Sequence, residues 1–229
     1  MPKKQHTPID ERLAELQQAK VIEIVYYGAG AGEKAFDLAR SAVLFAEQVI
    51  SLIESATPLP APIACQAGCD FCCRNQVELT PPEALLLGHY VEGHFTEAQQ
   101  EDLLAALRRS LELQEGKSKV EMARIRPPCP LLRDRRCSAY PARPLVCRAM
   151  HSLDAKMCES AYKKRDLTSP PFYAHRHEVY FSISQGLQRG CQAVGCQSGP
   201  LELARALLDC LSQPRPVERW LHGEKVFTA

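Results

Sequence analysis

Eight cysteines in two short, proline-rich segments constrain this chain more than any other feature of its sequence. The first segment is CQAGCDFCC, residues 65–73, and the second covers residues 129–158. Pro60 and Pro62 precede the first segment, Pro127 and Pro128 precede the second, and three further prolines interrupt the second. Long helices and inner strands are excluded there, because proline lacks a backbone donor and restricts the residue before it. These segments therefore need a crosslink. The eight cysteines are Cys65, Cys69, Cys72, Cys73, Cys129, Cys137, Cys147 and Cys158.

Metal coordination by thiolates is the crosslink that the sequence favours. The amino terminus MPKKQHTPID has no apolar signal region. We therefore expect a cytoplasmic protein whose eleven cysteines stay reduced. Spacings such as Cys65-x3-Cys69 and Cys69-x2-Cys72 can turn two sulfurs onto one ion, and the bound metal then contributes folding free energy. We predict that all eight cysteines of the two segments are metal ligands.

The adjacent pair Cys72 and Cys73 leaves the number of centres open. Neighbouring side chains tend to diverge, so either one of the two packs beside the site or the two reach different metals. Eight ligands suffice for two tetrahedral centres or two cubane clusters. Thiolates accept both zinc and iron, and the ligand count favours an iron-sulfur cluster over Zn²⁺.

An excess of arginine surrounds the second segment. Seven arginines lie between Arg124 and Arg148, with Asp134 as the one acidic residue. Four thiolates around Zn²⁺ or a cubane leave a charge of about −2, which these arginines would compensate. Phosphate binding is the alternative, because the arginine fork matches phosphate geometry. The formal net charge of +1 argues against nucleic acid, so we expect a metal ion as the partner and no membrane. No protein partner can be named.

Outside the cysteine segments the apolar pattern is helical. It predicts core helices over residues 34–55, 80–93 and 96–116, two more near 172–189 and 200–211, and a short one near 217–221. The second and third open with capping boxes, Thr80 with Glu83 and Thr96 with Gln99. We predict a mostly α fold, a helical scaffold around an irregular, proline-rich, cysteine-coordinated metal core. The stripe predicted to face the core in residues 34–55 is Leu38, Ala42, Phe45, Val49 and Leu52.

Three regions are expected along the chain. Residues 1–60 form an amino-terminal helical arm or hairpin, and residues 61–165 form the cysteine-cluster core with two inserted helices. Residues 166–229 supply helices that pack on the core. The best strand candidate is VIEIVYY, residues 21–27, followed by the glycines of GAGAGEK. A dinucleotide or methyl-donor loop would need further strands, so we favour a flexible connection between two helices.

Several single residues carry alternative interpretations. Cys210 lies on an apolar helix stripe and is predicted to be buried. Cys191 and Cys196 flank a small loop. They are either a redox pair or ordinary loop residues, and we favour the second interpretation. His151 follows Cys147 closely and is an alternative ligand, whereas His175 and His177 lie two apart on a helix and should point apart.

Two resemblances follow from the cysteine spacing. Cys65-x3-Cys69-x2-Cys72 is similar to the cluster-binding signature of radical S-adenosylmethionine enzymes, but the repeated strands of their barrel are missing. CQAGCDFCC followed by CPLLRDRRCSAYPARPLVCR resembles the YkgJ-type cysteine-cluster family, a zinc- or iron-chelating domain with a CxxCxxCC motif. This second resemblance implies metal or iron-sulfur binding by the matched cysteines.

The function expected from these observations is metal binding with a structural, sensing or trafficking role. A related cysteine cluster occurs in flagellin lysine methylases. An enzyme, either an iron-sulfur oxidoreductase or a methyltransferase, is therefore the alternative, although no methyl-donor pocket is evident. Bound zinc would favour the binding protein over the enzyme, because zinc has no redox chemistry.

Overall fold

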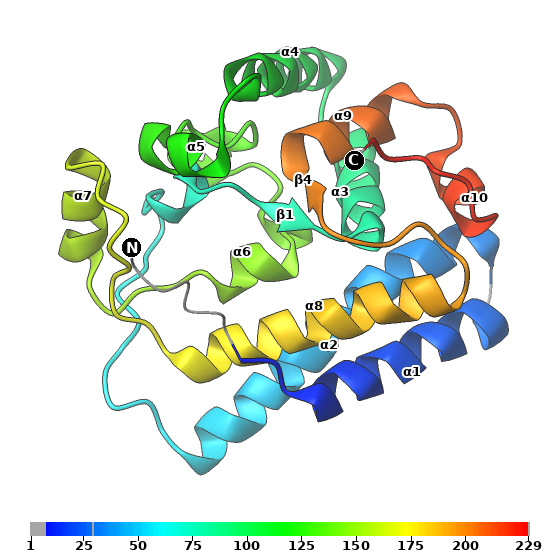
Figure 1. Ribbon diagram of the computed structural model, residues 1–229, viewed down its shortest axis with the longest axis horizontal. Helices are drawn as coiled ribbons and strands as arrows, with labels where there is room; N and C mark the ends of the chain where they lie inside the picture. The colour runs from blue at the N-terminus through cyan, green and yellow to red at the C-terminus, as the bar shows by residue number, and fades with distance from the viewer. Residues whose placement is uncertain (1–7, 29, 229) are drawn as a thin grey trace.

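The computed structural model describes residues 8–28 and 30–228, and these residues are mostly helical, as predicted. Three long helices form one layer, a second group of helices packs on it, and the cysteine segments gather at one end (Figure 1). The α-helices are α1 (Glu11–Tyr27), α2 (Ala31–Ala56), α3 (Pro81–His94), α4 (Glu97–Gln114), α5 (Lys119–Ile125), α6 (Leu145–Ala149), α7 (Ala155–Lys163), α8 (Ala174–Ala193), α9 (Leu203–Ser212) and α10 (Pro216–Leu221). The short elements are β1 (Glu78–Leu79), β2 (Leu132–Arg133), β3 (Arg136–Cys137), β4 (Leu201–Glu202) and the 3₁₀ turns η1 (Cys72–Arg74) and η2 (Tyr140–Ala142).

The long-helix layer consists of α1, α2 and α8, which pack against one another (Figure 1). Two glycines of α8 allow the close approach of α1. A Cβ on Gly186 would lie 2.3 Å from the Ala14 carbonyl oxygen, and one on Gly190 would lie 2.4 Å from Val21 Cβ. Larger side chains at these positions would therefore push the two helices apart.

The strand expected at residues 21–27 is wrong, because these residues form the last turns of α1. Asp10 caps this helix by accepting a hydrogen bond from the Leu13 N–H at 3.1 Å. Ala14, Gln17 and Val21 are buried, at a spacing that places all three on one helix face. Burial of that face therefore overrides the strand propensity of the β-branched run. The glycines that follow join α1 to α2, with Ala29 outside the described residues.

The predicted stripe of α2 is confirmed at Leu38 and Ala42, and Phe45 and Val49 are partly buried against the core, so only its last residue is wrong. Leu38 and Ala42 are fully buried, whereas the Leu52 side chain is 72% exposed. The predicted stripe advanced 3.5 residues per turn, and a straight helix drifts away from that repeat by about 20° per heptad. The residues that complete the buried face are Ala35, Ala39, Ala46 and Ile50.

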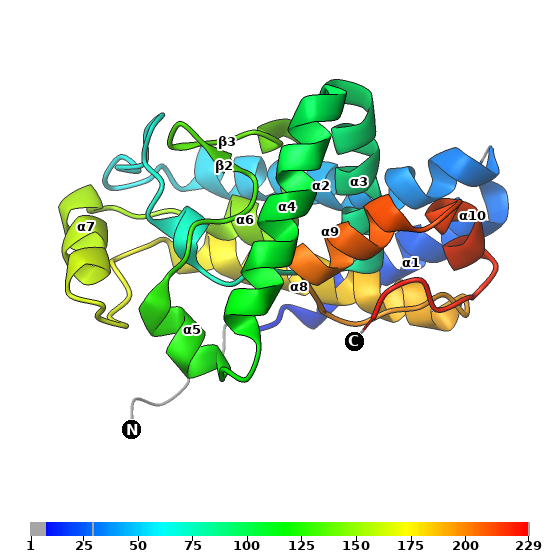
Figure 2. The same cartoon turned by 90° about the horizontal axis from the view of Figure 1, so that it is seen from above.

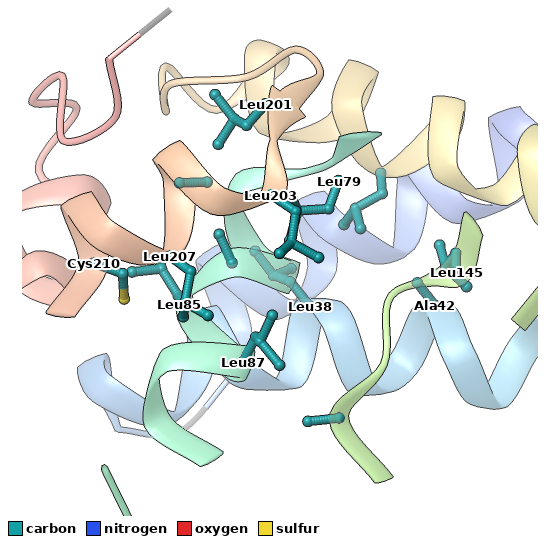
Figure 3. Packing of buried hydrophobic residues seen from close by; sticks show 14 of the residues in the cluster. Leu38, Ala42, Leu79, Leu85, Leu87, Leu145, Leu201, Leu203, Leu207 and Cys210 are labelled. Carbon is teal, nitrogen blue, oxygen red and sulfur yellow. The ribbon is translucent and has the colours of Figure 1, made fainter. Parts of the chain in front are cut away.

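The second group contains α3, α4, α9 and α10. Leucines of α3 and α9 pack there with Leu38 of α2 (Figure 3). Both predicted capping boxes are confirmed at the starts of α3 and α4. The helix expected to begin at Pro200 begins instead at Leu203. Leu201 and Glu202 first pair as β4 with Leu79 and Glu78 of β1, and the Glu202 side chain then caps α9.

The remaining elements, α5, α6, α7 and the β2–β3 hairpin, lie beside the chain that follows α2 (Figure 2). The sequence pattern missed these three helices, which have seven, five and nine residues. Each is too short to produce a clear apolar period. Among the described residues, no helix has the length and apolar character needed to cross a membrane.

Candidate metal centre

The first cysteine segment folds as two consecutive tight turns. The Cys69 N–H donates to the Gln66 carbonyl at 3.0 Å across a turn in which Gly68 has φ +86°. Glycine suits this position because it adopts positive φ without steric cost. The 3₁₀ turn η1 then carries Cys72 and Cys73 on successive residues.

Asp70 fastens this segment to the β2–β3 hairpin. Its side chain is only 6% exposed and accepts from Arg74 at 3.0 Å and from Arg135 at 3.4 Å. Arg135 lies in the tight turn of the hairpin, where Asp134 and Arg135 both have positive φ. A buried carboxylate with two arginine partners holds the two cysteine segments in register.

Backbone contacts bring the second segment against the first. The Cys129 N–H donates to the Cys73 carbonyl at 2.8 Å. Cys137 pairs with Leu132 in the hairpin, and α6 carries Cys147 in its short helix. The sequence separation between Cys73 and Cys129 is therefore bridged by a direct hydrogen bond.

Cys158 joins the first segment from α7. Asp154 caps α7, and the preceding Ser152 carbonyl accepts from the Ala64 N–H at 2.9 Å. Cys65, Cys69, Cys72 and Cys158 line one pocket of about 200 Å³. Four of the eight predicted ligands therefore border a common space.

Electrostatic coupling connects the thiols in two groups of three. Burial raises the pKa of Cys65, and the Cys69, Cys72 and Cys158 thiols raise it further. Burial also holds the pKa of Cys147 well above its ordinary value, with further increases from Cys129, Cys137 and Cys72. The first triad is Cys65, Cys69 and Cys158, and the second triad is Cys129, Cys137 and Cys147.

The adjacent pair lies between the two triads. A hydrogen bond with the Cys73 thiol is the largest cause that raises the pKa of Cys72, followed by burial. Cys72 also raises the pKa of members of both triads, Cys69 in the first and Cys137 in the second. A cation near these thiols would relieve the repulsion that opposes their ionisation.

All eleven cysteines are free thiols; of the eight predicted ligands, Cys65 is exposed and the other seven are partly buried. Among the described residues, no three Cys, His, Asp or Glu side chains converge on a point that could hold an ion. The chemistry of the donor set nevertheless fits a soft metal, because eight thiols accumulate beside arginines with few competing carboxylates.

Two of the seven arginines act directly on the thiols that they approach. Arg143 stacks over the Tyr140 ring at 3.8 Å and lowers the pKa of Cys137, which burial raises. Arg133 likewise lowers the pKa of Cys129, although burial raises it to about 11. Arg148 instead binds Glu47 at 2.8 Å and the Pro141 carbonyl, so its role is in packing.

The two histidines near the cysteines differ in whether their ring nitrogens have hydrogen-bond partners. His151 Nδ1 lies 2.8 Å from the Ala149 carbonyl, and His151 Nε2 accepts from the Tyr173 N–H at 2.8 Å. Both nitrogens are therefore occupied, which argues against the interpretation of His151 as a ligand. His177 lines the 200 Å³ pocket, and its buried Nε2 has no partner among the described residues. Burial lowers the pKa of His177 to about 4, so its ring is neutral near pH 7.

The cysteines outside the two segments pack in the core. Cys191, Cys196 and Cys210 are buried, and burial raises the pKa of Cys210 to about 12. The predicted burial of Cys210 is confirmed. The Cys196 N–H donates to the Cys191 carbonyl at 3.0 Å, which makes this pair a buried loop closure.

Sequence reasoning missed Asp70, Glu83 and His177 as residues that organise this end. Glu83 was recognised only as a helix cap, yet its carboxylate also accepts from the Leu145 N–H at 2.7 Å and so holds the start of α6. The Asp70 signal was its position inside the cysteine motif. No local pattern distinguishes His177 from other helical histidines.

Fold and donor set together define the class of this protein, a mostly α-helical protein with a cysteine-rich metal-chelating end. Residues 64–168 match the family model CxxCxxCC, described as "Putative zinc- or iron-chelating domain", and this segment includes all eight predicted ligands. This match over residues 64–168 confirms the resemblance inferred from the cysteine motif. Neither the curated proteins nor the solved structures contain a match to the chain.

Proposed function

We propose that the cysteine-rich end holds two metal centres. Cys65, Cys69 and Cys158 form three ligands of the first centre, and Cys129, Cys137 and Cys147 form three ligands of the second. The observation that carries this proposal is that Cys65, Cys69, Cys72 and Cys158 line one pocket, whereas the second triad lies outside its lining.

The adjacent pair supplies the fourth ligand of each centre in this proposal. Cys72 lines the same pocket as the first triad. The Cys73 carbonyl accepts from the Cys129 N–H, which places the Cys73 backbone beside the second triad. Because neighbouring side chains diverge, two adjacent cysteines suit two centres better than one.

Iron-sulfur clusters are the proposed occupants, with Zn²⁺ as the alternative. Two sets of four thiolates match two cubane clusters, and Arg133 and Arg143 offset part of the negative charge. The proposed role is a structural, sensing or metal-trafficking one. A cluster-dependent enzyme is the second candidate, favoured by the pocket of about 200 Å³ beside the first triad.

Anaerobic purification with elemental analysis and a visible spectrum tests the occupants. We expect about eight irons per chain and a coloured protein for two cubane clusters. A colourless protein with two zinc ions per chain would contradict iron-sulfur clusters as the occupants. It would support two zinc centres instead. A single metal or cluster per chain would contradict the two-centre proposal.

Paired substitutions test the ligand assignment. Cys158→Ser and Cys137→Ser should each remove about half of the bound metal, because they act on different centres, and the double variant should remove nearly all of it. Cys210→Ser is the matched control and should retain the full content, because Cys210 is buried in the core away from both triads. Complete loss in either single variant would indicate one shared centre.

A further inference from the structure

Charge is distributed unevenly along this chain. Residues 117–166, which contain α5, α7 and the β2–β3 hairpin, carry 13 Lys and Arg against 5 Asp and Glu. The rest of the chain carries 15 against 22, so a charge of +8 in one segment is nearly cancelled by −7 elsewhere. Two metal centres of about −2 each would leave this segment positive. The near-neutral total therefore conceals a basic region, whose field attracts and orients partners of opposite charge.

The β2–β3 hairpin presents its arginines despite repulsion between them. Arg133 and Arg136 are paired directly across the two strands, and both are exposed. Arg133 donates to backbone carbonyls, and neither arginine has a carboxylate partner among the described residues. Like charges directly opposite each other destabilise a strand pair. The turn residues Asp134 and Arg135 have φ of 47° and 60°, where two-residue hairpins favour Asn-Gly. Local stability alone therefore does not explain these charged residues.

The helix α7 extends the basic region beyond the hairpin. Its Tyr162 ring lies under the Arg74 guanidinium, with 4.9 Å between Cζ and the ring centroid, and Asp70 binds both Arg74 and Arg135. Two exposed lysines of α7 are seven residues apart, which places them on one helix face. Figure 2 shows α7 and the hairpin at the same end of the molecule. The basic surface consists of Arg133, Arg135, Arg136, Lys156 and Lys163.

Carboxylates interspersed in the basic surface distinguish between two kinds of anionic partner. Asp134 lies in the hairpin turn, and Glu159 binds Lys163 at 2.6 Å. A nucleic acid has a phosphate on every nucleotide, so it would meet these carboxylates and the acidic remainder of the chain. The carboxylates of a folded protein can instead be spaced to match the cations alone, and arginine forks bind carboxylates through two hydrogen bonds. The surface therefore favours an acidic protein.

We propose that the basic surface is the docking site for an acidic protein, whose Asp and Glu side chains pair with the hairpin arginines and the α7 lysines. The bound partner would lie beside the first cysteine segment, because Asp70 of that segment binds Arg135 of the hairpin. This inference does not rest on the proposed function, since none of the five cations is a proposed metal ligand.

Two anionic probes test the class of partner. A labelled peptide of alternating Glu and Ser represents the acidic protein, and a single-stranded DNA of equal charge represents nucleic acid. Fluorescence anisotropy with the full chain should show peptide binding that weakens at least about tenfold between about 20 and 200 mM salt. The DNA should bind no more tightly than the peptide. Absence of peptide binding, or tighter binding of the DNA, would overturn the proposal.

Paired variants of equal charge test the location. Arg136→Gln combined with Lys156→Gln should weaken peptide binding about tenfold. Arg108→Gln combined with Arg109→Gln is the control, because these exposed arginines of α4 lie outside the basic surface. The control should bind the peptide as the unmodified chain does. Equal weakening in the two double variants would show an effect of net charge alone and would overturn the proposal.

Arg136→Glu separates recognition from folding. This change places opposite charges across the strands from Arg133, so the midpoint of urea denaturation should stay the same or rise. Peptide binding should nevertheless fall, because the surface loses two units of positive charge. A lower midpoint together with lost binding would show that Arg136 serves the hairpin fold, and it would overturn the proposal.

Discussion

The Glu83 carboxylate, at the start of α3, accepts a hydrogen bond from the Leu145 N–H at the start of α6, with a distance of 2.7 Å. Its other oxygen accepts from the Thr80 N–H at 2.7 Å and the Thr80 hydroxyl at 2.8 Å. One buried side chain thus caps a core helix and fixes the short helix that carries Cys147. This contact therefore connects the helical core to the candidate metal centre.

Replacing Glu83 should therefore destabilise the protein strongly. Glu83→Ala leaves buried donors on Thr80 and Leu145 without an acceptor, and we expect a loss of about 3 kcal/mol in the free energy of unfolding. Urea denaturation measures this loss. Gln99→Ala is the control, because it breaks the exposed capping box of α4 and should cost about 1 kcal/mol or less. Equal costs for the two variants would show that Glu83 does not anchor α6.

Gly88 and Cys210 should be energetically coupled. A Cβ on Gly88 would lie 2.4 Å from the Cys210 sulfur, so Gly88→Ala should cost about 1–3 kcal/mol by overpacking. Cys210→Ala removes that sulfur, and the double variant should be more stable than the sum of the single effects predicts. Thermal or urea unfolding of the four proteins gives the coupling energy.

Gly93 provides the control on the same helix. Nothing lies within 4 Å of a Cβ added there, so Gly93→Ala should be neutral or stabilising by up to about 1 kcal/mol.

Additive effects of Gly88→Ala and Cys210→Ala would contradict the direct contact.

The carboxylate of Glu54 should make stability depend on pH in the acidic range. Glu54 binds the Arg176 guanidinium through two contacts of 2.6 Å, and this hydrogen bonding is the main cause that lowers the pKa of Glu54. A carboxyl group whose pKa is lower in the folded state stabilises the protein above its unfolded pKa of about 4.3. That contribution disappears as the pH falls through the folded pKa.

Unfolding experiments with Glu54→Gln at several pH values test this relationship. At pH 7 the variant should be less stable by about 2 kcal/mol, and the difference should shrink below about pH 4. Glu33→Gln serves as the control, because the Glu33 side chain is 60% exposed in its ion pair with Arg40 and should have little effect. A difference that is constant from pH 7 to pH 3 would contradict the assignment.

Metal removal should loosen one end of the molecule more than the other. The turn η1 has no buried residue and α7 has only Ala161 buried, so these elements have little apolar packing of their own. If the proposed centres crosslink them, a chelator should increase amide hydrogen exchange in η1, α7 and the β2–β3 hairpin. The packed helices α1, α8, α3 and α9 should keep their protection. Uniform loss of protection, or no change, would contradict a local crosslink.

The sequence was sufficient for the helical class, the core capping boxes and the cysteine motif. Capping is a contact between residues three apart, and the apolar period of a long helix is written in its own residues, so neither needs a distant partner. The same reasoning failed at residues 21–27. The β-branched residues there suggested a strand, whereas the contact of Val21 with Gly190 of α8 favours a helix.

The sequence by itself determined that eight thiols and many arginines occur in segments without a core of their own. Only the tertiary structure decided how they are grouped, because the grouping depends on contacts between residues far apart in the chain. Cys158 joins Cys65 and Cys69 at the pocket, Cys129 hydrogen bonds to Cys73, and Asp70 binds Arg135 of the hairpin. Spacing along the chain records local turns, whereas these pairings follow from how the helices pack and where they bring the loops together.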